Sequence, residues 1–150
     1  MYPTQTAMRA RAVSVRAALR RHRWAVGLVE SRATPSPATL RHRDAVLGCL
    51  RRAGFTVAGA AQAFSLLGSY LYGFALQELN LPFSTADELE AVGAGILAGL
   101  PAGAYPHLAE LMREHALKPG YRYADEFGVG LGLILAGLEG VRAELGRVTA

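Results

Sequence analysis

The sequence predicts an all-α fold, a helical bundle of about seven helices, and three observations support this. Apolar residues recur at helical spacing from end to end, and no stretch alternates with period two long enough to indicate a sheet. Proline and glycine interrupt the periodic segments. Of the 150 residues, 51% are hydrophobic and 19% charged, which is typical of a globular protein. We therefore expect residues 1–150 to form a single domain.

The N-terminal third is expected to contain three helices. The first covers about 5–22, and a short apolar helix covers Trp24–Arg32. Pro35 and Pro37 then interrupt the chain, because proline fixes φ and disfavours a helix before it. A further helix covers about 37–53 and ends at Gly54. The expected inward residues of the first and third helices are Met8, Ala12, Val15, Leu19, Leu40, Leu47 and Leu50.

The longest predicted helix covers about 55–80 and is apolar on two faces, which indicates burial between partners. One face holds Ala60, Phe64, Leu67, Leu71 and Phe74, and the other holds Ala63, Leu66, Tyr70, Gly73 and Gln77. Pro82 ends this helix, and Ser84, with Asp87 and Glu88 in the first turn, predicts the start of the next. That helix runs to about Leu100, and a shorter one covers about 106–116.

The last predicted helix, at about 122–147, shows the clearest pattern. Its apolar residues follow a 4-3-4-3-4 spacing, which is typical of a helix packed lengthwise on others. They are Phe127, Leu131, Ile134, Leu138, Val141 and Leu145. Five glycines are interleaved between Gly128 and Gly140, although each costs about 0.8–1 kcal/mol in a helix interior. We therefore expect close approach to this backbone, as at an interface.

Charge is distributed unevenly along the chain. Residues 1–52 contain eleven Arg and two acidic residues, which gives +9, whereas residues 53–150 contain five basic and ten acidic residues, which gives −5. A basic end next to an acidic body fits a contact with nucleic acid or with a basic domain. A solvated arginine face is the simpler explanation of the same charges.

A small helical membrane protein is the alternative interpretation. Residues 53–77 contain no charged side chain and are long enough to span a bilayer, and Arg51 and Arg52 precede them. However, four glycines and the polar residues Gln62, Ser65, Ser69 and Gln77 make the stretch only weakly hydrophobic. A buried central helix explains the same residues.

No catalytic or metal-binding pattern emerges. The four histidines form no HExxH motif and have no cysteine partners for zinc, so we expect neither a metal nor a cofactor. An enzyme using Cys49 or a histidine in a helical pocket lacks a local signature and remains a third hypothesis. A single cysteine cannot form an internal disulfide, and no signal peptide is evident, which favours a cytoplasmic location.

Five segments in order resemble a known family. They are Trp24–Arg32, Pro37–Phe55, Tyr70–Glu78, Tyr105–Leu111 and Phe127–Glu139. Over about residues 8–141 the chain resembles the C-terminal regulatory domain of TetR-type bacterial transcriptional repressors. No single motif decides this, but the ordered series with matching helix lengths is fairly specific.

The resemblance implies an all-helical domain that senses a small lipophilic effector and forms a homodimer. A four-helix bundle would join the helices near 56–80 and 122–147 to their copies. Its implied interface residues are Tyr70, Gly73, Gln77, Phe127, Leu131, Ile134 and Leu138, although the core and dimer stripes could be exchanged. The implied pocket lies among the first four helices.

Candidate walls of this pocket are Trp24, His42, Phe64 and Leu67, with His42 as a polar anchor. Trp24 would serve equally as a core anchor, and His42 would equally be exposed. The family also places a helix-turn-helix domain before this one, and no segment of this chain resembles it. We therefore expect specific DNA binding only through such a domain, and weak, salt-sensitive binding at most from the arginines of residues 1–52.

Overall fold

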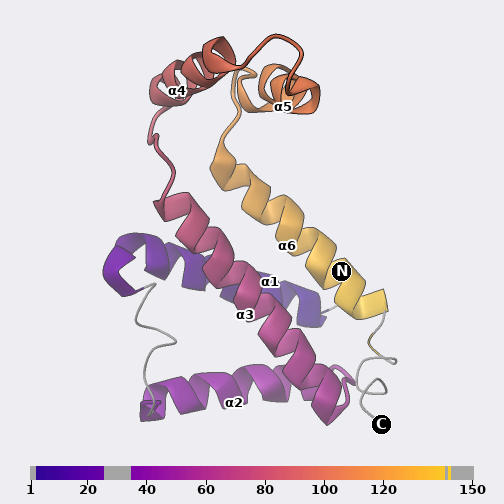
Figure 1. Ribbon diagram of the computed structural model, residues 1–150. Helices are drawn as coiled ribbons and strands as arrows, with labels where there is room; N and C mark the ends of the chain where they lie inside the picture. Colours follow the sequence, from indigo (N-terminus) through magenta and orange to yellow (C-terminus); the bar gives the residue numbers. More distant parts are fainter. Residues whose placement is uncertain (1–2, 26–34, 141, 143–150) are drawn as a thin grey trace. The chain divides into compact units, whose positions relative to one another are not determined.

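The computed structural model describes residues 3–25, 35–140 and 142, shown in colour in Figure 1. These residues are mostly helical and include no strand, so the predicted all-α class is confirmed. The α-helices are α1 (Pro3–Arg21), α2 (Pro37–Arg52), α3 (Val57–Leu79), α4 (Ala86–Gly99), α5 (Pro106–Leu111) and α6 (Tyr123–Gly140). A 3-10 turn at Arg23–Ala25 and a π-helical turn at Met112–Ala116 complete the described helical elements.

Two predicted helices extend beyond the described residues. The expected helix at Trp24–Arg32 begins in the 3-10 turn, and its remainder lies outside the described ranges. The described part of the last helix ends at Gly140, and Arg142 lies in a turn. The rest of the predicted continuation to residue 147, with Val141 and Leu145, lies outside the described residues.

Local sequence signals explain two of the helix starts. Ser36 accepts a hydrogen bond from the Thr39 N–H at 3.2 Å, and Pro37 occupies the first position of α2. At α4 the cap is Thr85 rather than the predicted Ser84. Thr85 and Glu88 form a reciprocal capping box with two bonds of 3.2 Å, which requires a residue three positions before the glutamate.

The chain divides into two compact units. The first contains residues 1–79 and 129–150, and the second contains residues 80–128. The prediction of one domain over residues 1–150 stays a prediction.

The core of the first unit is built on α3, against which α1 and α2 pack (Figure 1). Buried positions on α3 recur every three or four residues, and alanines among them allow close approach of the neighbouring helices. Each fully buried leucine contributes roughly 1.5–3 kcal/mol. The buried side chains are Met8, Ala12, Leu19, Val46, Leu50, Phe55, Ala60, Ala63, Leu67, Leu71, Phe74, Ala75, Leu131, Leu135 and Leu138.

The C-terminal part of α6 contacts α3 closely at one glycine. A Cβ atom on Gly130 would lie 2.4 Å from the Tyr70 hydroxyl oxygen and 2.8 Å from the adjoining ring carbon. Only glycine fits there without a shift of the tyrosine. The close approach predicted for this glycine-rich backbone is therefore made at Gly130 by a residue of the same chain.

The second unit is held by a comparable close contact. A Cβ atom on Gly93 of α4 would lie 2.4 Å from a methyl group of Leu117. In the same unit His115 Nε2 lies 2.7 Å from Glu126 Oε1, and the His115 ring packs edge-on against Tyr121, with 4.9 Å between the ring centres. Burial, followed by the negative charge of Glu126, raises the pKa of the Tyr121 hydroxyl.

Candidate functional site

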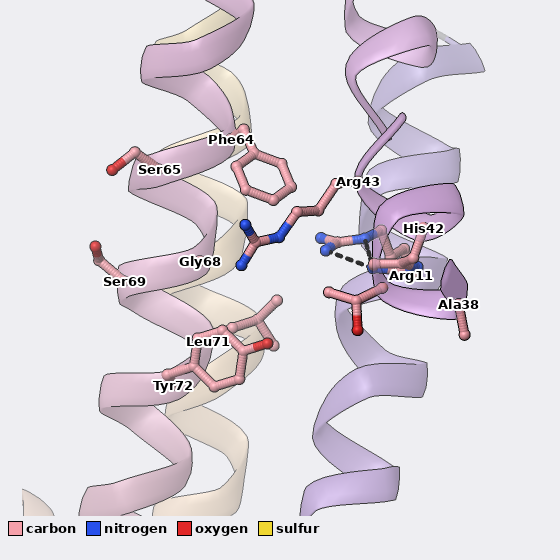
Figure 2. Close-up of a pocket in the computed structure, with 11 residues that line it drawn as sticks. Arg11, Ala38, His42, Arg43, Phe64, Ser65, Gly68, Ser69, Leu71 and Tyr72 are labelled. Atoms are coloured by element: carbon pink, nitrogen blue, oxygen red, sulfur yellow. Dashed lines mark hydrogen bonds between the residues drawn. The ribbon is translucent and has the colours of Figure 1, made fainter. Parts of the chain in front are cut away.

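A cavity of about 710 Å³ lies among α1, α2 and α3 of the first unit (Figure 2). Its size is within the range of small-molecule sites, roughly 300–1,000 Å³. The lining residues are Arg11 from α1, Ala38, Thr39, His42 and Arg43 from α2, and Phe64, Ser65, Gly68, Ser69, Leu71 and Tyr72 from α3.

The α3 wall follows from helical periodicity. Phe64, Gly68 and Tyr72 are four residues apart, so they share one face of the helix. Gly68 keeps the middle of this wall open, because a Cβ atom placed there would meet nothing within 4 Å. Phe64 and Tyr72 therefore border the cavity with a gap between them (Figure 2).

Arg11 and His42 join α1 to α2 at the cavity. The Arg11 Nε–H donates to His42 Nε2 at 3.1 Å, and the Nη2 atom of the same guanidinium lies 2.9 Å from that nitrogen (Figure 2). Because a guanidinium has no acceptor, His42 Nε2 must be the unprotonated nitrogen. His42 is therefore neutral in this arrangement, with its proton on Nδ1.

Electrostatics agree with a neutral His42. Partial burial, and then the positive charge of Arg11, lower the pKa of the His42 imidazole. Burial also lowers the pKa of the Arg11 guanidinium, which nevertheless stays charged because arginine titrates far above neutral pH. Arg11 also lies over the Phe64 ring, with 5.9 Å from its guanidinium carbon to the ring centre.

Two arginines belong to the described lining of the cavity. Arg43 extends from α2 toward α3, into the space bordered by Phe64 (Figure 2). With Arg11 it gives two guanidinium groups, and none of the eleven described lining residues is Asp or Glu. Hydroxyl groups of Thr39, Ser65 and Ser69 add polar atoms. The described lining thus offers hydrogen-bonding groups beside an aromatic wall.

A second arginine of α1 has a different environment. Arg16 donates from Nε to Glu78 Oε2 at 3.0 Å, and its Nη2 pairs with the other carboxylate oxygen. The two side chains are only 13% and 12% exposed. Arg23 donates to the backbone oxygen of Leu79 at 2.9 Å. Several arginines of the basic segment thus make contacts inside the first unit.

The structure brings two of the four predicted ligand-binding residues together. His42 and Phe64 both line the cavity. Leu67 is 2% exposed and lines a separate hollow of about 10 Å³ with Met8, Leu50 and Leu138, which has room for about one water molecule. Trp24 is 71% exposed in its 3-10 turn and does not line the cavity.

Arg11, Arg43 and Tyr72 line the cavity but were not among the predicted site residues. Arg11 lies three residues after Met8 and four before Val15, so it borders the predicted apolar face of α1. An arginine at the edge of an apolar face was the available signal for this site.

The predicted dimer residues fall on two kinds of surface. Phe127, Leu131 and Leu138 are buried within the chain, and Tyr70 and Ile134 are partly buried. Gly73 and Gln77 are exposed. The apolar side chains left exposed on these helices are Leu66 and Leu76 of α3 and Val129 and Leu133 of α6, at 47%, 52%, 61% and 71%. On α6 the exposed apolar stripe is therefore formed by Val129 and Leu133, whereas the predicted interface residues Phe127, Leu131 and Leu138 face the core.

The described residues contain no group of three His, Cys, Asp or Glu side chains able to hold a metal ion. Likewise, none of the described helices, α3 included, is long and apolar enough to cross a membrane.

Comparison with known proteins decides the family. Residues 3–142 match the family described as the Tetracyclin repressor-like, C-terminal domain. The chain belongs to this family. A TetR-type C-terminal domain also agrees with the solved structures that the chain resembles.

One similar structure is a possible TetR family transcriptional regulator from Streptomyces coelicolor A3(2), at 30% sequence identity and a TM-score of 0.72. This match covers 93% of the present chain and 66% of that chain. The fold also resembles apo ActR from Streptomyces coelicolor, at 24% identity and a TM-score of 0.68, over 92% of this chain and 65% of that one. No curated protein matches the chain.

Proposed function

We propose that this TetR-type domain is the ligand-sensing and dimerisation part of a transcriptional repressor that a small-molecule effector releases from DNA. The observation that carries the proposal is the cavity of about 710 Å³ among α1, α2 and α3 of a domain from this family. Its lining combines aromatic walls with a few polar groups, as binding sites for small molecules do.

The exposed apolar stripes support a homodimer. Leu66 and Leu76 on α3, and Val129 and Leu133 on α6, recur at helical spacing. Gly137 and Gly140 of α6 have nothing within 4 Å of an added Cβ, so a second chain can approach there. A two-fold symmetric contact would use the same stripes on both copies.

Cavity filling tests ligand binding. In Gly68→Leu the new side chain would occupy the cavity, because the position is open. Binding of aromatic compounds, measured by isothermal titration calorimetry, should be lost. Gly95→Leu on α4 is the matched control, since that position is equally open and does not line the cavity. Equal binding by both variants would contradict this location.

Charge on the exposed stripe tests the dimer. Leu133→Glu should give monomers in analytical ultracentrifugation, because an interface would bury the new carboxylate without a partner. Leu40→Glu on α2 is the control, as Leu40 is 53% exposed, contrary to the inward position expected for it, and lies on neither α3 nor α6. A monomeric unmodified protein at micromolar concentration would overturn the dimer.

Deletion of the gene tests the regulatory role. A set of promoters should become more active in the deletion strain, and compounds that bind the cavity should activate the same promoters in the intact strain. Unchanged promoters in both cases would overturn repression and leave the ligand-binding result standing.

A further inference from the structure

The second unit, residues 80–128, buries few of its large apolar side chains. All of its residues are described, and only Met112 and Phe127 among the large apolar ones are buried. By contrast, Tyr105, Leu108 and Leu111 are 55%, 43% and 53% exposed. They follow one another at intervals of three residues along α5, so they share one side of the helix and form what we call the α5 stripe. Neighbouring exposed apolar side chains of this size mark an interaction surface.

Charge indicates which kind of surface fits the α5 stripe. The second unit contains seven acidic and three basic residues, which gives −4. The Glu110 and Glu114 side chains are 72% and 67% exposed, and each lies near a histidine or lysine of its own unit, at 3.9 and 3.0 Å. Two α5 stripes packed on one another would bring two negative units together, and like charges oppose such a contact. The stripe therefore fits a basic surface that carries an apolar anchor.

A surface of this kind lies at the end of α1. Trp24 is 71% exposed, and the exposed Arg20, Arg21 and Arg23 precede it within four residues; we call these four residues the Trp24 surface. Residues 1–25 contain six arginines and no acidic residue. Glu78 lies 4.0 Å from Arg20 but is already held by another arginine of α1. Tryptophan and arginine are the residue types most enriched among those that contribute most to protein–protein binding.

We propose that in the homodimer the Trp24 surface of one copy packs on the α5 stripe of the other. Two-fold symmetry would form this contact twice, once in each direction, and would close the assembly. The proposal rests on the proposed homodimer and adds a second contact to its α3 and α6 stripes.

Two observations favour a second copy as the partner. A stable interface buries about 800 Å² or more on each partner, and the four exposed apolar side chains of α3 and α6 are too few to supply that area alone. The second unit is also joined directly to both of these helices, because it follows α3 at Asn80 and contains the start of α6 up to Gly128.

The test uses the fluorescence of Trp24, which is the only tryptophan of the chain. Its emission is measured from nanomolar to micromolar concentration, beside analytical ultracentrifugation of the same samples. Emission should move to shorter wavelength as dimers form, because the ring leaves water. Dimers with unchanged emission would overturn this contact and leave the homodimer standing. A chain that stays monomeric would overturn the homodimer and this contact together.

The Leu133→Glu variant, which should be monomeric, supplies the reference emission. Its Trp24 should emit at the long wavelength of an exposed ring at every concentration. Emission at short wavelength from this monomer would show that its own chain covers Trp24, and would overturn the contact between copies.

Substitutions on the α5 stripe locate the contact. A variant with both Leu108→Ser and Leu111→Ser should lose the emission shift and dimerise about tenfold more weakly, since it removes most of the apolar wall. Ile96→Ser is the matched control, because Ile96 is 46% exposed in the same unit but lies on α4. An unchanged shift in the double variant, or an equal loss in the control, would overturn the assignment to the stripe.

Charge reversal on the Trp24 surface gives an independent measurement. Arg21→Glu should weaken dimerisation about tenfold, because it would place a carboxylate against the negative second unit. Arg41→Glu, at an exposed arginine of α2 outside the Trp24 surface, is the control. Circular dichroism checks the folding of all variants. If the double serine variant unfolds, Arg21→Glu decides, and equal affinity in Arg21→Glu and Arg41→Glu would then overturn the contact.

Discussion

In each half of α1 an arginine lies near a phenylalanine ring of α3, but the two arginines have different hydrogen-bonding partners. In the C-terminal half, Arg16 lies 5.1 Å from the centre of the Phe74 ring and pairs with the Glu78 carboxylate. In the N-terminal half, Arg11 lies 5.9 Å from the centre of the Phe64 ring and bonds to the neutral His42. The same motif thus closes a core at one end and borders a cavity at the other.

The difference lies in what neutralises each charge. Glu78 supplies Arg16 with an anion from within the chain, so that region is complete without a ligand. His42 offers Arg11 a lone pair but no negative charge, and no acidic side chain of the described residues pairs with Arg11. An arginine near an aromatic ring is therefore compatible with either a packed core or a binding site. In this chain the arginine of the packed core is the one that pairs with a carboxylate.

The largest expected effect is the loss of stability when the Arg16–Glu78 pair is broken. Arg16→Gln should lower the free energy of unfolding by about 3 kcal/mol, because it leaves the Glu78 carboxylate nearly buried without its bidentate partner. Urea denaturation measures this. Arg20→Gln is the control, since Arg20 is 60% exposed at 4.0 Å from Glu78 and should change stability by less than about 1 kcal/mol. Similar losses of stability in both variants would show that the paired Arg16 is no more important for folding than the exposed Arg20.

Substitution of the Phe74 and Phe64 rings should show the same difference between the two regions, with smaller changes in stability. Phe74→Leu should cost about 1–2 kcal/mol, since it removes the cation–π contact with Arg16 and the ring contact with Tyr70. Phe64→Leu should cost less than about 1 kcal/mol, because that ring borders open space. Thermal and urea unfolding of the two variants would settle the order, and a larger loss for Phe64→Leu would reverse our interpretation.

Removal of the cavity charge should hardly affect folding. Arg11→Gln loses the bond to His42 but also removes a half-buried positive charge without a carboxylate partner, so its stability should stay within about 0.5 kcal/mol of the unmodified protein. The measurement is the urea midpoint without ligand. A loss comparable to that of Arg16→Gln would show that Arg11 is a structural residue.

The smallest effect concerns pH. Burial and Arg11 lower the His42 pKa below its usual value near 6.5, so the unfolded chain binds a proton there more readily than the folded chain. The stability from neutral His42 is complete above about pH 6.5 and is lost as pH falls toward the lowered folded pKa. His42→Gln should abolish this part of the acid destabilisation. Parallel pH profiles for the two proteins would contradict it.

The sequence was sufficient to predict the helices but not which faces meet. Periodicity and the Pro and Gly breaks locate α2, α3 and α4 closely. On α6, however, both Leu131 with Leu138 and Val129 with Leu133 form apolar stripes, so periodicity alone cannot identify the inner one. The packing of Tyr70 on Gly130 fixes that choice, and it joins residues sixty positions apart.

The site was harder to predict for the same reason. His42 and Phe64 are on the expected helices, and the family resemblance, narrowed by residue type, pointed to them. Arg11 and Arg43 have long side chains whose direction depends on three helices at once. An arginine in a basic stretch is ordinarily solvated, so their gathering on one cavity appears only in three dimensions.

The Arg11–His42 bond has a mechanical consequence. Arg11 and Arg16 lie on one continuous helix, about 7.5 Å apart along its axis. A ligand that accepts hydrogen bonds from Arg11 would compete with His42 for the same donors, so it would exchange an attachment to α2 for an attachment to the ligand. The Glu78 pair holds the other half of α1 in place throughout. Occupancy of the cavity would therefore be transmitted as movement of one end of α1 relative to the other.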